Sequence, residues 1–550
     1  MIWRDWPAVL MALAGAATLI YWWRVARPLW VDEEMLGLNL RWRSFSELGG
    51  ALWLDQSAPL GWLALERTAL LLFGVDERGA RALTVVWGLG TLATAVWVGH
   101  RWMGRPAAAV LAALCSVGPW IVFFTLELKH YSADACGALL LPGLAAWAAE
   151  PVEGGRPARR IGTFWGVAAI GGWLSNGVTF VAPVCAVVLV GCHWRRGGLR
   201  SALRAALPGV VWLASLGLNY VLVLRHALGN AYLENYWSFA FPPQSAGLAG
   251  TIAWTAHVMQ TFPIKPVGTG WPVLFWCVVL VGFGHALIRH PPLGLSYASV
   301  PVAALALGLL GIVPPFERLG LWSVPALYVG VALGVDAGVR LATERHRLSP
   351  LVALAAPAVL VASALVVLDI VGNGIAELGA KPVDSNYGLD DRKAVRRVED
   401  LRQPDDVVFT THFGLAGLWW YGGVDISNAD AGAWLGDSQV FEMGYATDRP
   451  SCEAAQSALD QLATHARRVI VYLGFRMNVL PDGFDRFVLG ELGRRGALVA
   501  YSQYADLSQV AAFDLTQPAS PAAAAWLRDK TIAAGPPLAG CLTVHPARRW

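Results

Sequence analysis

The sequence predicts a polytopic α-helical membrane protein with about eleven transmembrane helices and a C-terminal extracytoplasmic α/β domain. Of its 550 residues, 56% are hydrophobic and only 15% are charged, whereas soluble domains carry about 25% charged residues. Apolar runs of roughly 17–23 residues recur, the length that crosses a ~30 Å hydrocarbon core. The composition changes after residue 372. We therefore expect a membrane domain over residues 1–372 and a soluble domain over residues 373–550.

The first predicted span ends near Trp23. It superficially resembles a signal peptide, but an aromatic belt, Tyr21-Trp22-Trp23, stands where a small-residue cleavage site is expected. An uncleaved span is therefore predicted. Ten further spans are expected, near residues 82–100, 106–125, 133–149, 161–176, 177–193, 205–224, 270–288, 294–314, 321–339 and 350–371.

Arginines gather in alternate connections between these spans, such as 101–105, 156–160 and 195–204. The positive-inside rule assigns these connections and the N-terminus to the cytoplasm. The opposite side then holds the long first loop 31–80, the turn 127–134, the loop 225–268 and the C-terminal domain. The net charge of +3 is too small to indicate a nucleic-acid partner.

The C-terminal region alternates helical and extended patterns, which is typical of an α/β layer. Helices are expected over 390–402, 452–468 and 482–495, and strands over 406–411, 469–473 and 497–501. In an oxidising compartment Cys452 and Cys541 are candidates for a disulfide, with two free thiols as the alternative. The other five cysteines lie in apolar segments, and no cysteine spacing indicates zinc.

Three consecutive carboxylates, Asp32, Glu33 and Glu34, follow the first span. An ionised group deep in a bilayer costs roughly 2.5–3.5 kcal/mol, so the cluster is expected at a water boundary. The loop 31–80 that it opens is too long for a simple connector and is expected to contain short amphipathic helices on the membrane surface. Asp55 lies at a break between them, either as a turn residue or as part of a site.

A second polar group interrupts the apolar sequence between two spans. Glu127, His130, Tyr131 and Asp134 have the spacing of one helical stripe, and Lys129 lies beside them. One interpretation is a short wet turn in which Glu127 and Lys129 compensate each other. We favour a substrate cavity, because five polar groups exceed what a turn needs.

Aromatic and basic residues mark two further outer segments. The loop 225–268 contains Tyr232, Tyr236, Trp237 and several other aromatic residues, which either stack on sugars or anchor the chain at the interface. Arg318 begins the tenth span, where it either binds a phosphate or pairs with Glu317 and snorkels.

The order of these motifs resembles that of the GT-C glycosyltransferases of the protein O-mannosyltransferase and lipid A aminoarabinose transferase superfamily. The shared pattern is an Asp32-Glu33 pair after the first span, a Pro59-Leu60 turn, the segment 73–81, the segment 127–134, and an arginine entering a late span. The resemblance covers roughly residues 5–340 and is strongest over 28–142. It implies a polyprenyl-phosphate-linked sugar donor and a glycan, lipid or protein acceptor, in a bacterial plasma membrane.

The resemblance also implies residue roles. Asp32 matches the catalytic aspartate and would be the general base, with Glu33 as the second member of the pair. Asp134 matches a second acidic position of the cavity, and Arg318 lies where the family has a basic residue near the donor phosphate. Glu34 is expected to be a solvated bystander, and Asp32 is expected to face Asp134 across an outward-opening cavity.

Two departures affect the donor site. The aminoarabinose transferases have a Lys-Pro-Pro-Leu turn where this chain has Ser57-Ala58-Pro59-Leu60, and an arginine where it has Met35. Lys129 or Arg318 would then stabilise the departing phosphate of the inverting displacement that the family carries out. Asp32, Glu33 and Glu127 have the chemistry to bind a divalent metal, but no spacing requires one.

Two other classes of protein remain as alternatives. A transporter also carries intramembrane charges, although transporters tend to show repeats and interrupted helices near the middle of the membrane. A non-catalytic scaffold of cell-envelope glycan assembly is compatible with every pattern described above if Asp32 is dispensable.

Overall fold

The computed structural model describes residues 6–151, 157–225, 236–243, 247–344, 350–422, 440–443, 459–460, 462–464, 466–475 and 484–520. The chain forms two compact units. Unit 1 contains residues 1–25, 45–51 and 57–381, and unit 2 contains residues 26–44, 52–56 and 382–550. A segment that follows the first helix therefore belongs to the same unit as the C-terminal region.

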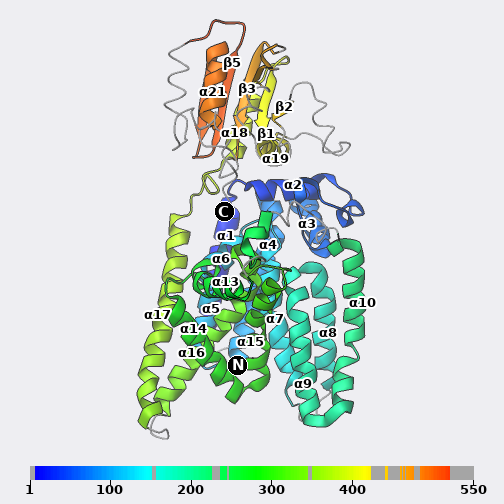
Figure 1. Cartoon of the computed structure of the whole chain (residues 1–550), viewed down its shortest axis with the longest axis vertical. Coiled ribbons are helices and arrows are strands. Elements are labelled where there is room, and N and C mark those ends of the chain that lie inside the picture. The colour runs from blue at the N-terminus through cyan, green and yellow to red at the C-terminus, as the bar shows by residue number, and fades with distance from the viewer. Residues whose placement is uncertain are drawn as a thin grey trace. The chain divides into compact units, whose positions relative to one another are not determined.

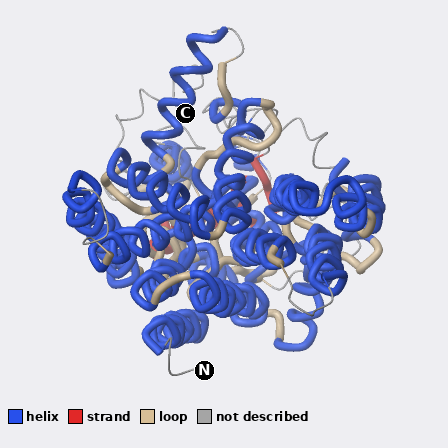
Figure 2. The backbone as a smooth tube through the Cα atoms, turned by 90° about the horizontal axis from the view of Figure 1, so that it is seen from below, coloured by secondary structure: helices blue, strands red, loops and turns tan. Residues whose placement is uncertain are grey.

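Unit 1 is a bundle of helices that pack side by side (Figure 2). Its α-helices are α1 (Trp6–Val25), α3 (Leu60–Phe73), α4 (Glu77–Trp102), α5 (Arg105–Val117), α6 (Pro119–Thr125), α7 (Tyr131–Ala149), α8 (Pro157–Leu174), α9 (Asn176–Ala206), α10 (Gly209–Asn219), α13 (Gly247–Thr261), α14 (Pro272–Arg289), α15 (Pro291–Leu309), α16 (Val324–Thr343) and α17 (Pro350–Ala380). Short 3₁₀ and π segments lie between them, namely η2 (Glu47–Gly49), η4 (Tyr220–Leu224), η5 (Ser238–Ala240), η7 (Pro263–Val267) and η8 (Glu317–Ser323).

Eight helices of the described part are long and apolar enough to cross a membrane, and the bent pair α5–α6 would make a ninth. The eight are Trp6–Val25, Glu77–Trp102, Tyr131–Ala149, Asn176–Ala206, Pro272–Arg289, Pro291–Leu309, Glu317–Thr343 and Ala356–Ala380. The protein is therefore a multi-pass membrane protein. Within the described residues, α8 is less apolar than these helices and Gly209–Leu224 is shorter, so the predicted total of about eleven stays a prediction.

Local sequence signals explain where these helices begin and how closely they pack. The Asp76 carboxylate accepts the backbone N–H groups of Arg78 and Gly79 and so caps α4. Pro119 begins α6 directly after Gly118, which gives the 50° bend after α5. A Cβ on Gly282 would lie 2.0 Å from the Gly330 carbonyl oxygen, so glycine is what lets α14 approach α16.

The outside of the bundle is apolar. Val187, Val273 and Ile288 are 74%, 78% and 82% exposed. Soluble monomers rarely expose large contiguous apolar surface, whereas a bundle that crosses a membrane meets lipid there. The exposed side chains therefore fit the same conclusion as the helix lengths.

Unit 2 contains a five-stranded mixed sheet in the order β2-β1-β3-β5-β4 (Figure 1). Strands β1 (Val407–Thr411), β2 (Val440–Met443) and β3 (Arg468–Leu473) pair in parallel, and β5 (Ser508–Asp514) pairs antiparallel with β3 and with β4 (Ala497–Tyr504). Phe409, Val471, Val488 and Phe513 belong to its buried core. The unit also contains α2 (Val31–Trp42), η3 (Trp53–Asp55), α18 (Asp391–Leu401), α19 (His412–Tyr421) and α21 (Phe484–Arg495).

The predicted helices over 390–402 and 482–495 and the three predicted strands are confirmed to within a few residues. Most of the predicted helix 452–468 lies outside the described residues. The composition boundary after residue 372 falls inside α17, since polar Asn373 and Glu377 occupy its last turns without ending it. The boundary between the units lies at Lys381.

Candidate active site

The acidic triplet forms the first turn of α2. Asp32, Glu33 and Glu34 follow the first helical residue, Val31, where carboxylates interact favourably with the helix dipole. The backbone N–H of Trp30 donates to Glu33 Oε2 over 2.8 Å. Glu33 therefore caps the helix that it belongs to.

The three carboxylates differ in exposure. The Asp32 side chain is partly exposed, whereas Glu33 and Glu34 are fully buried. The expectation that Glu34 is a solvated bystander is wrong, because α2 packs against α19 of the same unit. Burial raises the pKa of the Tyr472 phenol, and the negative charges of Asp391 and Glu34 raise it further, so Glu34 lies near that hydroxyl.

Glu33 is tied to a residue far away in the sequence. The side-chain amide of Asn386 donates to Glu33 Oε2 over 3.2 Å, and Asn386 is itself fully buried. The carboxylate of Glu33 therefore accepts two hydrogen bonds, one from its own helix start and one from the C-terminal region. This arrangement supports a role in positioning Asp32.

Asp55 lies in an exposed turn of unit 2. Its backbone has φ +54° and it ends the short helix η3. Aspartate tolerates this left-handed conformation better than most residues. The turn is held by Asn39, which accepts the backbone N–H of Trp53 over 2.8 Å and donates to its carbonyl over 3.2 Å.

The second cluster lies in unit 1, at the start of α7. Asp134 Oδ1 accepts the hydroxyl of Ser175 over 2.8 Å and the backbone N–H of Gly177 over 3.0 Å. Its other oxygen lies 3.5 Å from His130 Nε2. The carboxylate thus joins the first turn of α7 to the first turn of α9.

His130 is buried between two polar side chains of unit 1. The side-chain amide of Asn176 lies 3.1 Å from His130 Nε2, the same ring nitrogen that faces Asp134. Burial lowers the pKa of His130, and nearby Lys129 acts in the same direction against the charge of Asp134. The ring packs edge-on against Trp62, with centroids 6.2 Å apart, and at 5.0 Å from the ring of Tyr131.

The predicted stripe is correct only in part. His130, Tyr131 and Asp134 share the start of α7, but Glu127 and Lys129 lie in the turn between α6 and α7. The helix does not persist across this turn because α6 ends at Thr125. Glu127 and Lys129 are nevertheless 4% and 7% exposed, so all five polar groups lie in or beside a buried region.

Arg318 lies in η8, next to an aromatic side chain of the predicted loop 225–268. Its guanidinium carbon is 5.5 Å from the centroid of the Trp237 ring. Phe316 packs against Trp237 and Phe239, with centroids 6.3 and 5.3 Å away. One aromatic residue of the loop therefore contacts this arginine, while Tyr232 lies outside the described residues.

Several site residues were missed by sequence reasoning. Ser175 and Asn176 form a polar pair between two apolar runs, a signal that the sequence contained. Glu66 on α3 is fully buried, and within the described part of the chain neither carboxylate oxygen has a hydrogen-bond partner. Asn386 carried no signal, since its partner Glu33 lies 353 residues away.

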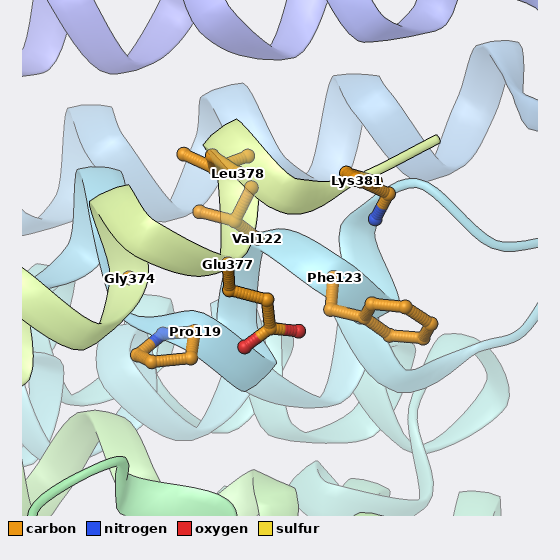
Figure 3. A pocket seen from close by; sticks show the side chains of 7 residues that line it. All are labelled: Pro119, Val122, Phe123, Gly374, Glu377, Leu378 and Lys381. Carbon is orange, nitrogen blue, oxygen red and sulfur yellow. The ribbon is translucent and has the colours of Figure 1, made fainter. Parts of the chain in front are cut away.

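Figure 3 shows a pocket of unit 1 between α6 and the end of α17. Its empty volume, open solvent included, is about 190 Å³. The Glu377 carboxylate points into it, and Lys381 Nζ lies 4.1 Å from the centroid of the Phe123 ring. None of the predicted site residues lines this pocket. Its lining consists of Pro119, Val122, Phe123, Gly374, Glu377, Leu378 and Lys381.

Two further predictions concern a possible metal site and a disulfide bond. Among the residues that the structure describes, no group of three or more histidine, cysteine, aspartate or glutamate side chains is arranged to hold a metal ion. Cys452 and Cys541 lie outside the described residues, so their predicted disulfide stays a prediction.

The fold of the chain is similar to that of two solved structures of the membrane protein ArnT. ArnT from Cupriavidus metallidurans bound to undecaprenyl phosphate matches with a TM-score of 0.56 and 14% identity, over 92% of this chain and 97% of that chain. The apo state of the same ArnT matches with a TM-score of 0.53 and 13% identity, over 92% of this chain and 98% of that chain. No family model and no curated protein sequence matches. At these identities the similarity establishes the fold, as the motif order predicted.

Proposed function

We propose that this protein is a glycosyltransferase that moves a hexosyl or pentosyl group from a polyprenyl-phosphate donor to an acceptor hydroxyl. The observation that carries the proposal is the fold shared with ArnT over nearly the whole of both chains. One of the ArnT structures contains undecaprenyl phosphate, the chemistry of such a donor carrier. The reaction takes place on the outer face of a bacterial plasma membrane, with the N-terminus in the cytoplasm.

Asp32 is the general base of the proposed reaction. It is the member of the acidic triplet with exposed surface, at the water-accessible start of α2. The acceptor oxygen attacks the anomeric carbon while its proton passes to Asp32. The bond from that carbon to the phosphate oxygen breaks, and the polyprenyl phosphate leaves with the electron pair. A well-placed base contributes typically about 10²–10⁴-fold to such a rate.

The departing phosphate requires fixed positive charge. Arg318 is the first candidate, because its guanidinium lies beside the Trp237 ring and can form two parallel hydrogen bonds to a phosphate. Lys129 is the second candidate, beside the Asp134 cluster of the same unit. Asp134, His130, Tyr131 and Glu127 line the substrate cavity in this proposal.

The test is Asp32→Asn, which keeps the size of the side chain and removes the base. We expect sugar transfer from polyprenyl-phosphate donors in membranes to fall by at least 10²-fold, with insertion and thermal unfolding unchanged. Glu47→Gln removes an exposed acid elsewhere and is expected to keep full activity. Full activity of Asp32→Asn would reject the catalytic role and favour a scaffold, and solute accumulation in proteoliposomes of the protein alone would indicate a transporter.

The acceptor and the sugar are identified together by comparing strains. Mass spectrometry of envelope glycans, lipids and proteins in a deletion strain should show one sugar missing from the acceptor. The corresponding polyprenyl-phosphate sugar should accumulate. A strain that makes only Asp32→Asn should reproduce the deletion pattern.

A further inference from the structure

We infer that Asn386, a residue of the C-terminal region, is a positioning residue that sets the orientation of Asp32 through Glu33. The inference rests on the proposed function, since it concerns the base of that reaction. All the contacts that support it lie within unit 2, which joins α2 to the C-terminal sheet domain.

Asn386 bridges the two sides of the start of α2. Its amide nitrogen donates to Glu33 Oε2 over 3.2 Å, while its carbonyl oxygen accepts a hydrogen bond from Arg27 Nη1 over 3.2 Å. Asp32 lies between these two attachment points in the chain. Because Asn386 is fully buried, both hydrogen bonds are shielded from competition with water.

Other residues of the C-terminal region hold the backbone around the same helix. Tyr421 accepts the backbone N–H of Leu29 with its hydroxyl oxygen over 2.8 Å, and Arg392 donates to the carbonyl of Ala26 over 3.0 Å. At the other end of α2, Arg41 donates to the carbonyl of Trp420 over 2.9 Å. Both ends of the helix are therefore fixed by the domain that follows residue 381.

One stripe of α2 provides the contact surface. Glu33, Gly37 and Arg41 are spaced four residues apart, so they share a face of the helix. A Cβ on Gly37 would lie 2.9 Å from the ring of Trp420, which shows how closely α2 approaches α19. Asp32 is one residue away from this stripe, about 100° around the helix, and keeps exposed surface.

Positioning of this kind has a direct kinetic consequence. A general base must lie within hydrogen-bond reach of the proton that it takes, and a displacement of about 1 Å can cost on the order of 10²-fold in rate. A loosened α2 therefore slows the chemical step more than it weakens donor binding.

The experiment compares Asn386→Asp in two backgrounds, the wild type and Glu33→Gln. In the wild type the new carboxylate removes the donor and opposes the Glu33 charge, so kcat should fall about 10–10²-fold while the donor KM changes less than about twofold. In the Glu33→Gln background the repulsion is absent and a Gln side chain can donate to the new carboxylate. In that background, Asn386→Asp should then lower kcat by a factor at least about threefold smaller than in the wild type.

A second variant loosens the helix by another route. Gly37→Ala should push α2 away from Trp420 and lower kcat in the same way, whereas Gly162→Ala, with nothing within 4 Å of its new methyl group, should not. Gln403→Glu makes the same amide-to-carboxylate change at an exposed position of unit 2 and should leave kcat within about twofold.

Hydrogen exchange separates this inference from the proposed function. Asn386→Asp and Gly37→Ala should raise amide exchange in the peptide covering residues 29–42, with no change across unit 1. Unchanged amide exchange together with unchanged kcat would overturn the inference. An equal fall in kcat in the wild-type and Glu33→Gln backgrounds would show that Asn386 does not act through Glu33. If the wild type transfers no sugar, the proposed function fails, while the exchange measurement still tests the contact.

Discussion

Ser175 donates its hydroxyl proton to Asp134 Oδ1 over 2.8 Å, and the same hydroxyl oxygen accepts the backbone N–H of Val178 over 3.0 Å. One short side chain therefore caps α9 and fixes a carboxylate of α7. The second oxygen of Asp134 is turned toward His130. Each carboxylate oxygen of Asp134 therefore has its own contact, so a structural role and the proposed site role can be tested separately.

Asp134→Asn should reduce sugar transfer by about tenfold or more with little loss of stability. The amide oxygen can still accept from Ser175 and Gly177, but the negative charge is lost. Ser175→Ala is the structural comparison and should lower the free energy of unfolding by about 1–2 kcal/mol, since it removes the helix cap. Thermal unfolding in detergent and a transfer assay measure the two effects, and a stability loss in Asp134→Asn as large as in Ser175→Ala would make the role structural.

His130 should make the protein less stable as the pH falls below about 6.5, the ordinary pKa of histidine. The folded state holds the ring neutral and lowers its pKa, so in this range the unfolded chain binds a proton that the folded chain does not. The unfolding temperature should drop between pH 7.5 and 5.5, and His130→Gln should flatten the drop. His257→Gln, at an exposed position of α13, is the control, and an identical pH profile in both variants would contradict the prediction.

Asp391→Asn should stabilise unit 2 at pH 8. Burial raises the pKa of Asp391 from 3.8 to about 7, so the folded state binds a proton that the unfolded state loses above pH 3.8. Stability therefore falls as the pH rises from about 4 through 7, by up to about 4 kcal/mol.

The Asp391→Asn variant keeps an oxygen for the hydrogen bond from Ser508 and does not titrate. Hydrogen exchange of β3 and β5 as a function of pH measures the difference. Asp405→Asn, an exposed site in the same unit, should behave as the wild type. Equal protection of the wild type and Asp391→Asn at pH 8 would show that the carboxyl is not destabilising.

Glu66→Met should raise the free energy of unfolding by about 1–3 kcal/mol at pH 8. Burial raises the pKa of Glu66 well above its ordinary value, and within the described residues its carboxyl lacks hydrogen-bond partners. An unbranched apolar side chain of similar length removes that cost. Thermal unfolding is the measurement, with exposed Glu47→Met as the control, and a fall in the unfolding temperature would show that the Glu66 carboxyl is stabilised in the fold. A gain in stability together with lost transfer activity would mark Glu66 as a functional acid.

Sequence patterns were sufficient to predict the helices and strands that form because of their local sequence alone. Uniformly apolar runs predicted the helices that cross the membrane, and short β-branched runs such as Val469-Ile470-Val471 predicted strands. The helix α19 was missed because His412–Tyr421 is apolar on all sides and has no helical period. The break between α6 and α7 was missed because spacing alone does not reveal where a helix stops.

Long-range packing limited the prediction of the site. The burial of Glu34 follows from α19, which begins 378 residues later, and a carboxylate in an isolated first turn would be expected to face water. The hydrogen bond between Glu33 and Asn386 spans 353 residues. The motif order singled out Asp32 as the candidate base, which stays a prediction, whereas nothing in the sequence indicated that Asn386 contacts the neighbouring Glu33.

Unit 2 combines residues 26–44 and 52–56 with residues 382–550, so its two parts are synthesised at different times. The helix that carries Asp32 is made early, but Asn386 emerges 353 residues after Glu33. At translation rates of ~5–20 residues per second, roughly 20–70 s pass between the two. A ribosome-bound or prematurely terminated chain can thus insert many of its spans while the start of α2 still lacks its hydrogen bond from Asn386. Under the proposed function, transfer activity would begin only after the last membrane helix is complete.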